Sequence, residues 1–117
     1  MITAIAFTVY PVRDMARARG FYEGVLGLRA TYNYQDEWVE YDVGPGTFAL
    51  TTTEMGHQPG ARGAVVGFEV EDLDRCVTML KGKAVPFVLD IFETPVCRLA
   101  VIEDPDGNHL TVHRRKT

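Results

Sequence analysis

The stretch Phe7–Arg17, FTVYPVRDMAR, decides the fold because it recurs 58 residues later as Val65–Arg75, VVGFEVEDLDR. Each copy runs from β-branched and aromatic residues into an aspartate, Asp14 or Asp72, that is placed to cap a helix. The identities are few, but they fall at the strand end, at the cap and in the apolar stripe of the helix. The sequence therefore predicts an internal repeat.

The first copy predicts a strand over Ile2–Val12, then a helix that starts after Asp14 and stops at Gly27. Three more strands are expected, over Leu28–Tyr34, Trp38–Val43 and Thr47–Thr53, with turns at Gln35-Asp36 and Gly44-Pro45-Gly46.

The second copy repeats this pattern after a polar, Gly- and Pro-containing linker at Glu54–Arg62. It predicts a strand over Ala64–Val70 and a helix that starts after Asp72 and stops at Gly82. The remaining strands are expected over Val85–Ile91, Val96–Ile102 and His109–Val112, with a tight turn at Asp104-Pro105-Asp106-Gly107-Asn108.

Each copy therefore has the element order β-α-β-β-β, and half a chain of about 55 residues is marginal as an independent fold. We expect one domain over 1–117, with module 1 at about 1–54, a linker at about 55–62 and module 2 at about 63–115. The predicted fold class is α+β. Two tandem βαβββ modules would form a curved mixed sheet around a cavity, with the helices on its convex face.

The composition excludes several classes of function. The net charge of −4 and a longest basic run of only Arg114-Arg115-Lys116 argue against nucleic-acid binding. No apolar stretch is long enough to span a membrane, and Met1–Tyr10 lacks the features of a signal peptide. The chain contains no serine, which excludes serine-hydrolase chemistry. Cys76 and Cys97 fit reduced thiols in a cytoplasmic protein better than a disulfide framework.

Two local motifs resemble the vicinal-oxygen-chelate superfamily, which contains glyoxalases, bleomycin-resistance proteins and extradiol dioxygenases. The first is Val12-Arg13-Asp14-Met15 followed by Phe21-Tyr22 and Val25-Leu26-Gly27-Leu28. The second is Glu103–Asn108, EDPDGN, before the final strand. The resemblance covers Ile2 to about His113 and implies the glyoxalase-like fold. It says little about activity, because the matching residues are turns, caps and core positions.

The resemblance also implies where metal-dependent relatives hold a divalent ion with His and Glu side chains. The corresponding positions here are Phe7, Val65, Thr111 and a residue within Phe48–Thr51, taken as Leu50. Aromatic and aliphatic side chains cannot bind a cation, and one threonine hydroxyl is a poor ligand. We therefore predict no metal ion and no other cofactor, and we assign these positions to the lining of a ligand cavity.

Other polar residues are candidates for ligand contact. Strand alternation places His109, Thr111 and His113 on one face of the last strand, and Trp38, Glu40 and Asp42 on one face of theirs. An acidic residue beside an aromatic one suits a cationic or hydroxylated ligand. Glu40 and His113 are weak candidates for acid–base catalysis. His57 and Glu54 in the linker are expected to be exposed.

Arg98 lies in the middle of a strand and needs a partner, because burying an unpaired charge is costly. A structural ion pair with Glu40 or Glu93 is preferred over a clamp for a ligand carboxylate or phosphate. The hydroxyls of Tyr32, Tyr34, Thr51 and Thr53 are expected in the cavity or at its rim. Cys97 is a candidate nucleophile only if a histidine lies beside it.

These observations favour a metal-free protein of the bleomycin-resistance type that binds an aromatic or polar cyclic small molecule. The alternative is an enzyme of the same superfamily, a lyase, isomerase or dioxygenase-like protein that uses Glu40 or His113. A third possibility is a metal enzyme with displaced ligands such as His109, His113 and Glu40. The resemblance also implies a homodimer, for which Trp38 and the tyrosines offer apolar interface surface.

Overall fold

The repeated aspartates cap the two helices of the chain in the same way. Asp14 Oδ1 accepts the backbone N–H of Arg17 at 3.0 Å, and Asp72 Oδ1 accepts that of Arg75 at 3.0 Å. Both caps have extended backbone, as a residue that precedes a helix should. The repeat seen in the sequence is therefore present in the way that the two helices begin.

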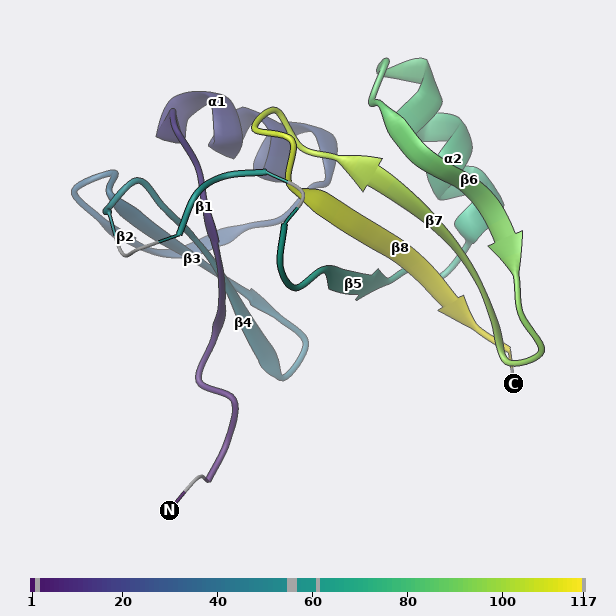
Figure 1. The fold of residues 1–117 in the computed structure, drawn as a ribbon, viewed down its shortest axis with the longest axis horizontal. Coiled ribbons are helices and arrows are strands. Elements are labelled where there is room, and N and C mark those ends of the chain that lie inside the picture. The colour runs from purple at the N-terminus through teal and green to yellow at the C-terminus, as the bar shows by residue number, and fades with distance from the viewer. Residues whose placement is uncertain (2, 55–56, 61, 117) are drawn as a thin grey trace. The chain divides into compact units, whose positions relative to one another are not determined.

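The structure is a computed structural model that describes residues 1, 3–54, 57–60 and 62–116. The chain divides into two compact units, Met1–Pro59 and Gly60–Thr117, each of which is described by itself (Figure 1). The boundary falls within the stretch expected to be the linker. Met55, Gly56 and Ala61 of that stretch lie outside the described residues, as do Ile2 and Thr117.

The first unit is a four-stranded mixed sheet with one helical segment. Its sheet order is β1-β4-β3-β2, with β1 parallel to β4 and the other pairs antiparallel. In chain order the elements are β1 (Thr8–Pro11), α1 (Met15–Arg19), the π-helix η1 (Gly20–Val25), β2 (Ala30–Tyr34), β3 (Trp38–Val43) and β4 (Gly46–Thr51).

The second unit has the same topology, with order β5-β8-β7-β6 and β5 parallel to β8. Its elements are β5 (Val66–Glu69), α2 (Leu73–Gly82), β6 (Phe87–Glu93), β7 (Cys97–Glu103) and β8 (His109–Arg115). Two βαβββ units with four-stranded mixed sheets make this an α+β chain of glyoxalase-like fold, as predicted. It stays a prediction that the two modules form a curved sheet around a cavity.

The strand registers show which positions of the two units are equivalent. The N–H of Val12 donates to the carbonyl of Thr51 at 2.8 Å, and the N–H of Val70 donates to that of His113 at 2.9 Å. Thr51 therefore corresponds to His113. Counting back two residues along β4 and β8 makes Ala49 the counterpart of Thr111.

Aromatic rings fill the core of the first unit, between the helical segment and one face of the sheet. Tyr22 and Tyr41 are completely buried and Phe48 nearly so. The ring centroid of Tyr22 lies 5.1 Å from that of Phe48 and 6.5 Å from that of Tyr41. Val39 and Leu50 are also fully buried. By strand alternation, these residues define the face of the sheet that the helix covers.

The first strand begins later than predicted. It was expected from Ile2, but its ladder with β4 starts only at Thr8 and Phe48. The second helix ends at Gly82 as predicted, although the residue with positive φ beyond it is Ala84, at +58°. Gly27, with φ of +75°, does end the first helical segment as predicted.

The first helix also changes type, which the sequence pattern did not predict. After Arg19 the backbone widens into a π-helix, in which the N–H of Leu26 donates to the carbonyl of Phe21 at 3.0 Å. Phe21 and Tyr22 are adjacent, yet both are buried. A wider turn lets two consecutive rings reach the core, and π-turns of this kind are rare.

A polar network connects this π-helix to the sheet. Glu23 Oε2 accepts hydrogen bonds from Arg19 Nε at 2.6 Å and from the hydroxyl of Tyr41 at 2.9 Å. The bond from Arg19, and after it the bond from Tyr41, holds the pKa of Glu23 below its ordinary value. Burial, reinforced by the bond to Glu23, raises the pKa of Tyr41.

Two turns are built by side chains. In the β2–β3 turn, Gln35 and Asp36 have φ of +53° and +55°, and the amide of Asn33 donates to Asp36 Oδ1 at 2.8 Å. In the β7–β8 turn, buried Asp104 accepts the backbone N–H groups of Asp106 and Asn108 at 2.9 and 2.8 Å. The EDPDGN motif therefore serves to fold this hairpin.

We predict that the Glu23 network makes the first unit sensitive to acid. Because the pKa of Glu23 is lowered by folding, its stabilising effect is present above the ordinary glutamate pKa of about 4.3 and is lost as the pH falls through the lower folded-state pKa. Tyr41→Phe should reduce the free energy of unfolding by about 1 kcal/mol at neutral pH, measured by urea denaturation. Glu23→Gln should lose less stability than the wild type on acidification. Identical acid profiles would contradict this assignment.

Candidate functional site

The face of the first sheet that the helix does not cover carries a group of aromatic side chains around one carboxylate. In β3, Val39 and Tyr41 point into the core, whereas Trp38 and Glu40 alternate with them and are half-buried. Tyr34 pairs with Trp38, and Tyr32 pairs with Glu40. Directly paired residues of antiparallel strands share a face. We call Phe7, Tyr32, Tyr34, Trp38 and Glu40 the aromatic face.

Phe7 contacts Trp38, and Trp38 in turn contacts Glu40. The rings of Phe7 and Trp38 meet edge to face, with centroids 5.1 Å apart and an interplanar angle of 86°. Trp38 Nε1 donates to Glu40 Oε2 at 2.8 Å. The register places the fully buried Ala49 of β4 beside Glu40. The predicted site residues Phe7, Trp38 and Glu40 are thus brought together.

The aromatic face remains accessible within this structure. Phe7 is 42% exposed, Tyr32 53% and Tyr34 51%. Apolar side chains that gather in one exposed patch mark ligand or partner sites, whereas scattered ones need no explanation. Thr51, which was expected at the cavity, is buried, and its hydroxyl donates to the carbonyl of Glu37 at 3.0 Å. Thr53 is exposed.

The corresponding face of the second unit carries two histidines. His109, Thr111 and His113 alternate with the buried Leu110 and Val112, as predicted. His113 Nδ1 and Glu69 Oε1 form a hydrogen bond of 2.5 Å. His109 Nε2 lies 3.6 Å from Glu103 Oε1. Each histidine therefore has a carboxylate neighbour from an adjacent strand.

The sequence pattern did not indicate Glu69 as a partner of His113. Glu69 also accepts the backbone N–H of Arg115 at 2.9 Å, and that bond, followed by the one from His113, lowers the pKa of Glu69. The signal that identifies it is the parallel register, in which Glu69 pairs with His113. Sequence spacing alone contains no such register.

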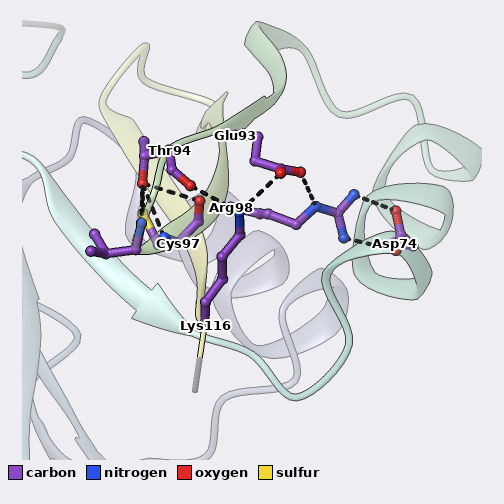
Figure 2. A network of polar contacts seen from close by, with 7 residues as sticks. Asp74, Glu93, Thr94, Cys97, Arg98 and Lys116 are labelled. Carbon is purple, nitrogen blue, oxygen red and sulfur yellow. Dashed lines mark hydrogen bonds and ion pairs between the residues drawn. The ribbon is translucent and has the colours of Figure 1, made fainter.

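Arg98 forms ion pairs with carboxylates of its own unit. Its guanidinium forms two 3.0 Å bonds to the carboxylate of Asp74 in α2, and Nε lies 3.6 Å from Glu93 (Figure 2). The bidentate bond lowers the pKa of Asp74. The structure therefore shows the ion pair that was preferred for Arg98. Asp74 is its closer partner and Glu93 lies farther away. Asp74 had not been considered, and Glu40 instead accepts the Trp38 bond.

Neither cysteine is placed as a nucleophile. Cys97 is buried, and its sulfur lies 3.1 Å from the hydroxyl of Thr94, which also accepts the N–H of Cys97 (Figure 2). Burial raises the pKa of the Cys76 thiol and so reduces its thiolate fraction. Both are free thiols.

The four positions where the resemblance implies metal ligands do not fit a cation. Three of these positions are occupied by Phe7, Val65 and Thr111, as expected from the sequence. The register favours Ala49, not Leu50, as the counterpart of Thr111, since Leu50 lies on the buried face with Phe48. Only the threonine hydroxyl can donate electrons to a metal. Within the described residues, no group of three or more His, Cys, Asp or Glu side chains could hold an ion.

Two hollows lie beside the helix caps. One, of about 250 Å³, lies at the ends of β1 and β4, where Arg13, Glu54 and the exposed His57 contribute to its wall. The other, of about 360 Å³, lies beside α2 and is lined by Asp72, Arg75 and Met79 among others. Neither lining includes a residue of the aromatic face. The wall of the first includes Thr51 and Thr53, whose hydroxyls were expected at the cavity or its rim.

The family model of the Glyoxalase/Bleomycin resistance protein/Dioxygenase superfamily matches residues 4–112. The chain belongs to this superfamily. No curated protein matches the chain significantly. No helix in the described part of this superfamily member is long and apolar enough to cross a membrane.

Several solved structures share the fold of this superfamily member. An antibiotic binding protein, TnmS3 from Streptomyces sp. CB03234, is 22% identical, with a TM-score of 0.80 and 98% of each chain covered. A lactoylglutathione lyase from Agrobacterium tumefaciens is 20% identical, with a TM-score of 0.79 and coverage of 97% of this chain and 95% of that one. A superfamily member from Sphaerobacter thermophilus DSM 20745 is 22% identical, with a TM-score of 0.80, and the match covers 97% and 98%.

We predict that Arg98 contributes to stability and not to ligand binding. Arg98→Met and Asp74→Asn should each lower Tm by a small amount, because each removes a bidentate ion pair that is partly exposed to solvent. The double variant should lose less than the sum of the two, as expected for residues in direct contact. Additive losses, or a change in ligand affinity with Tm unchanged, would contradict the structural role.

Proposed function

We propose that this superfamily member binds a small organic molecule with an aromatic or polar ring, and that it does so on the aromatic face without a metal ion. The observation that carries the proposal is the contact of Phe7 with Trp38 and of Trp38 with Glu40 on an accessible sheet face. Flat rings stack on aromatic side chains, and a carboxylate fixes the orientation of a polar ligand group.

Two further observations support binding without a metal. The positions implied for metal ligands hold Phe7, Val65, Ala49 and Thr111, and aromatic and aliphatic groups provide contact surface for a ligand instead. One structural neighbour is described as an antibiotic binding protein, so the fold is compatible with a binding role. An antibiotic-like compound is accordingly the first ligand class to test.

A catalytic alternative rests on the His113–Glu69 hydrogen bond in the second unit. A carboxylate on Nδ1 orients an imidazole so that Nε2 can exchange protons with a substrate. One structural neighbour is described as a lactoylglutathione lyase, so the fold also hosts catalysis. Conversion of a bound ligand by the wild type, but not by His113→Gln, would favour this alternative.

We also propose a cytoplasmic homodimer. The free thiols of Cys76 and Cys97 suit a reducing compartment. The exposed tyrosines of β2 provide apolar surface of the kind found at interfaces. Sedimentation at micromolar concentration should give twice the 13.1 kDa mass of the chain. A monomeric mass would contradict the dimer without affecting the ligand proposal.

Ligand binding can be measured directly, because Trp38 is the single tryptophan of the chain. We expect aromatic antibiotics and simpler aromatic compounds to change its fluorescence saturably and to raise Tm. Phe7→Ala should weaken binding about tenfold, since truncation of a contacting ring costs about 1–2 kcal/mol.

Val96→Ala is the matched control, because it removes an exposed apolar side chain from the β6–β7 connection. It should bind as the wild type does. If no compound in a broad aromatic panel perturbs Trp38, or if Phe7→Ala binds every ligand unchanged, the aromatic face is not a binding site.

A further inference from the structure

Glu40 differs from several other carboxylates of this chain in its electrostatic partners. Several Asp and Glu side chains lie within 3.0 Å of an Arg or Lys nitrogen: Glu23 with Arg19, Asp74 with Arg98, Asp90 with Lys81 and Glu93 with Lys116. Among the described residues, no cationic side chain lies within 4.0 Å of Glu40, although Glu40 is half-buried. Within the described part of the chain, its carboxylate accepts a hydrogen bond from the neutral indole N–H of Trp38.

The repeat offers an internal comparison for this position. Trp38 pairs with Thr51 and Leu99 pairs with His113, so the equivalence of Thr51 and His113 makes Leu99 the counterpart of Trp38. Two residues on, Val101 is the counterpart of Glu40. The same strand of the same fold therefore forms with a valine at this point. The carboxylate of Glu40 is not a requirement of the βαβββ architecture.

The surroundings of Glu40 favour positive charge in a ligand. The helix-free face of the first sheet also carries Asp42, and none of its described strand residues is Lys, Arg or His. Trp38 contacts the carboxylate, Tyr32 pairs with Glu40 across the strands, and Phe7 packs on Trp38. The faces of aromatic rings attract cations. Trp38 occupies Oε2 of Glu40, so Oε1 is available to accept a ligand hydrogen bond.

A neutral hydroxyl would suit this geometry less well than a cation. A ligand that stacks on the rings displaces water from Glu40, and a desolvated carboxylate is costly unless an opposite charge compensates it. A hydroxyl donates one hydrogen bond and leaves the charge in place. An ammonium group neutralises the charge and also gains the attraction of the rings.

We propose that the ligand of the aromatic face is an organic cation, a protonated amine or quaternary ammonium attached to an aromatic body. This inference rests on the proposed binding function and adds the charge of the ligand to it. Glu40 supplies the counter-charge, Trp38 and Phe7 supply the walls, and the Trp38 N–H orients the carboxylate.

The test compares three small aromatic probes of different charge on the intact protein. Benzyltrimethylammonium is the cation, benzyl alcohol is neutral and phenylacetate is an anion, and Trp38 fluorescence reports binding of each. We expect the cation to bind about tenfold more tightly than the neutral probe, and the anion to bind most weakly. Raising the salt concentration should reduce this preference.

Two variants assign the preference to one carboxylate. Glu40→Gln keeps an oxygen that accepts the Trp38 N–H but removes the charge, so the cation should no longer bind more tightly than benzyl alcohol does. Asp42→Asn makes the same change in net charge two residues away on the same face, and it should retain the preference. Both variants should keep the wild-type circular dichroism spectrum.

The outcomes separate this inference from the function on which it rests. If all three probes bind equally well, the inference is wrong and the binding function stands. If Glu40→Gln keeps the preference, or Asp42→Asn loses it to the same extent, the specific role of Glu40 is wrong. If no probe and no larger aromatic compound perturbs Trp38, both proposals fall.

Discussion

Tyr41 connects β3 to the π-helix that covers one face of the first sheet, and the rest of that unit depends on how it is held. Its ring packs with Tyr22 and Phe48, and its hydroxyl donates to Glu23 of the π-helix. A buried hydroxyl without this acceptor would be costly, so the orientation of β3 is fixed by chemistry as well as by packing. Because side chains alternate along a strand, the burial of Tyr41 places Glu40 on the opposite face. The core of the unit thereby determines what its surface presents.

The duplicated architecture separates what the fold needs from what this chain has added. Both units keep the aspartate cap, the parallel pair of strands and the same strand order. They differ on the faces that the helices leave uncovered. The first unit has Trp38 and Glu40 where the second has Leu99 and Val101, and the second has His113 where the first has Thr51. Two faces with unlike chemistry on one scaffold are consistent with function residing in sites and not in the fold.

Much of this architecture could be predicted from the sequence, because it depends on local signals. Caps at Asp14 and Asp72, the stop at Gly27 and the alternation in β3 are properties of neighbouring residues. The predictions that failed needed information from other strands. The placement of Leu50 required a register, the partner of Arg98 came from a helix 24 residues away, and the π-turn depends on two rings that share one core. Ligand contacts at the predicted site residues stay a prediction.

The β2–β3 turn gives the aromatic face a means of variation. Tyr34 and Trp38 flank a connection whose central residues, Gln35 and Asp36, hold positive φ without glycine and are secured by Asn33 and by Arg19. Surface hairpin ends tolerate changes of length and sequence far better than cores do. A longer or differently shaped loop here would add new groups at the margin of the rings while Tyr41 and its neighbours stayed in place. Such a scaffold can acquire a new specificity without having to fold differently.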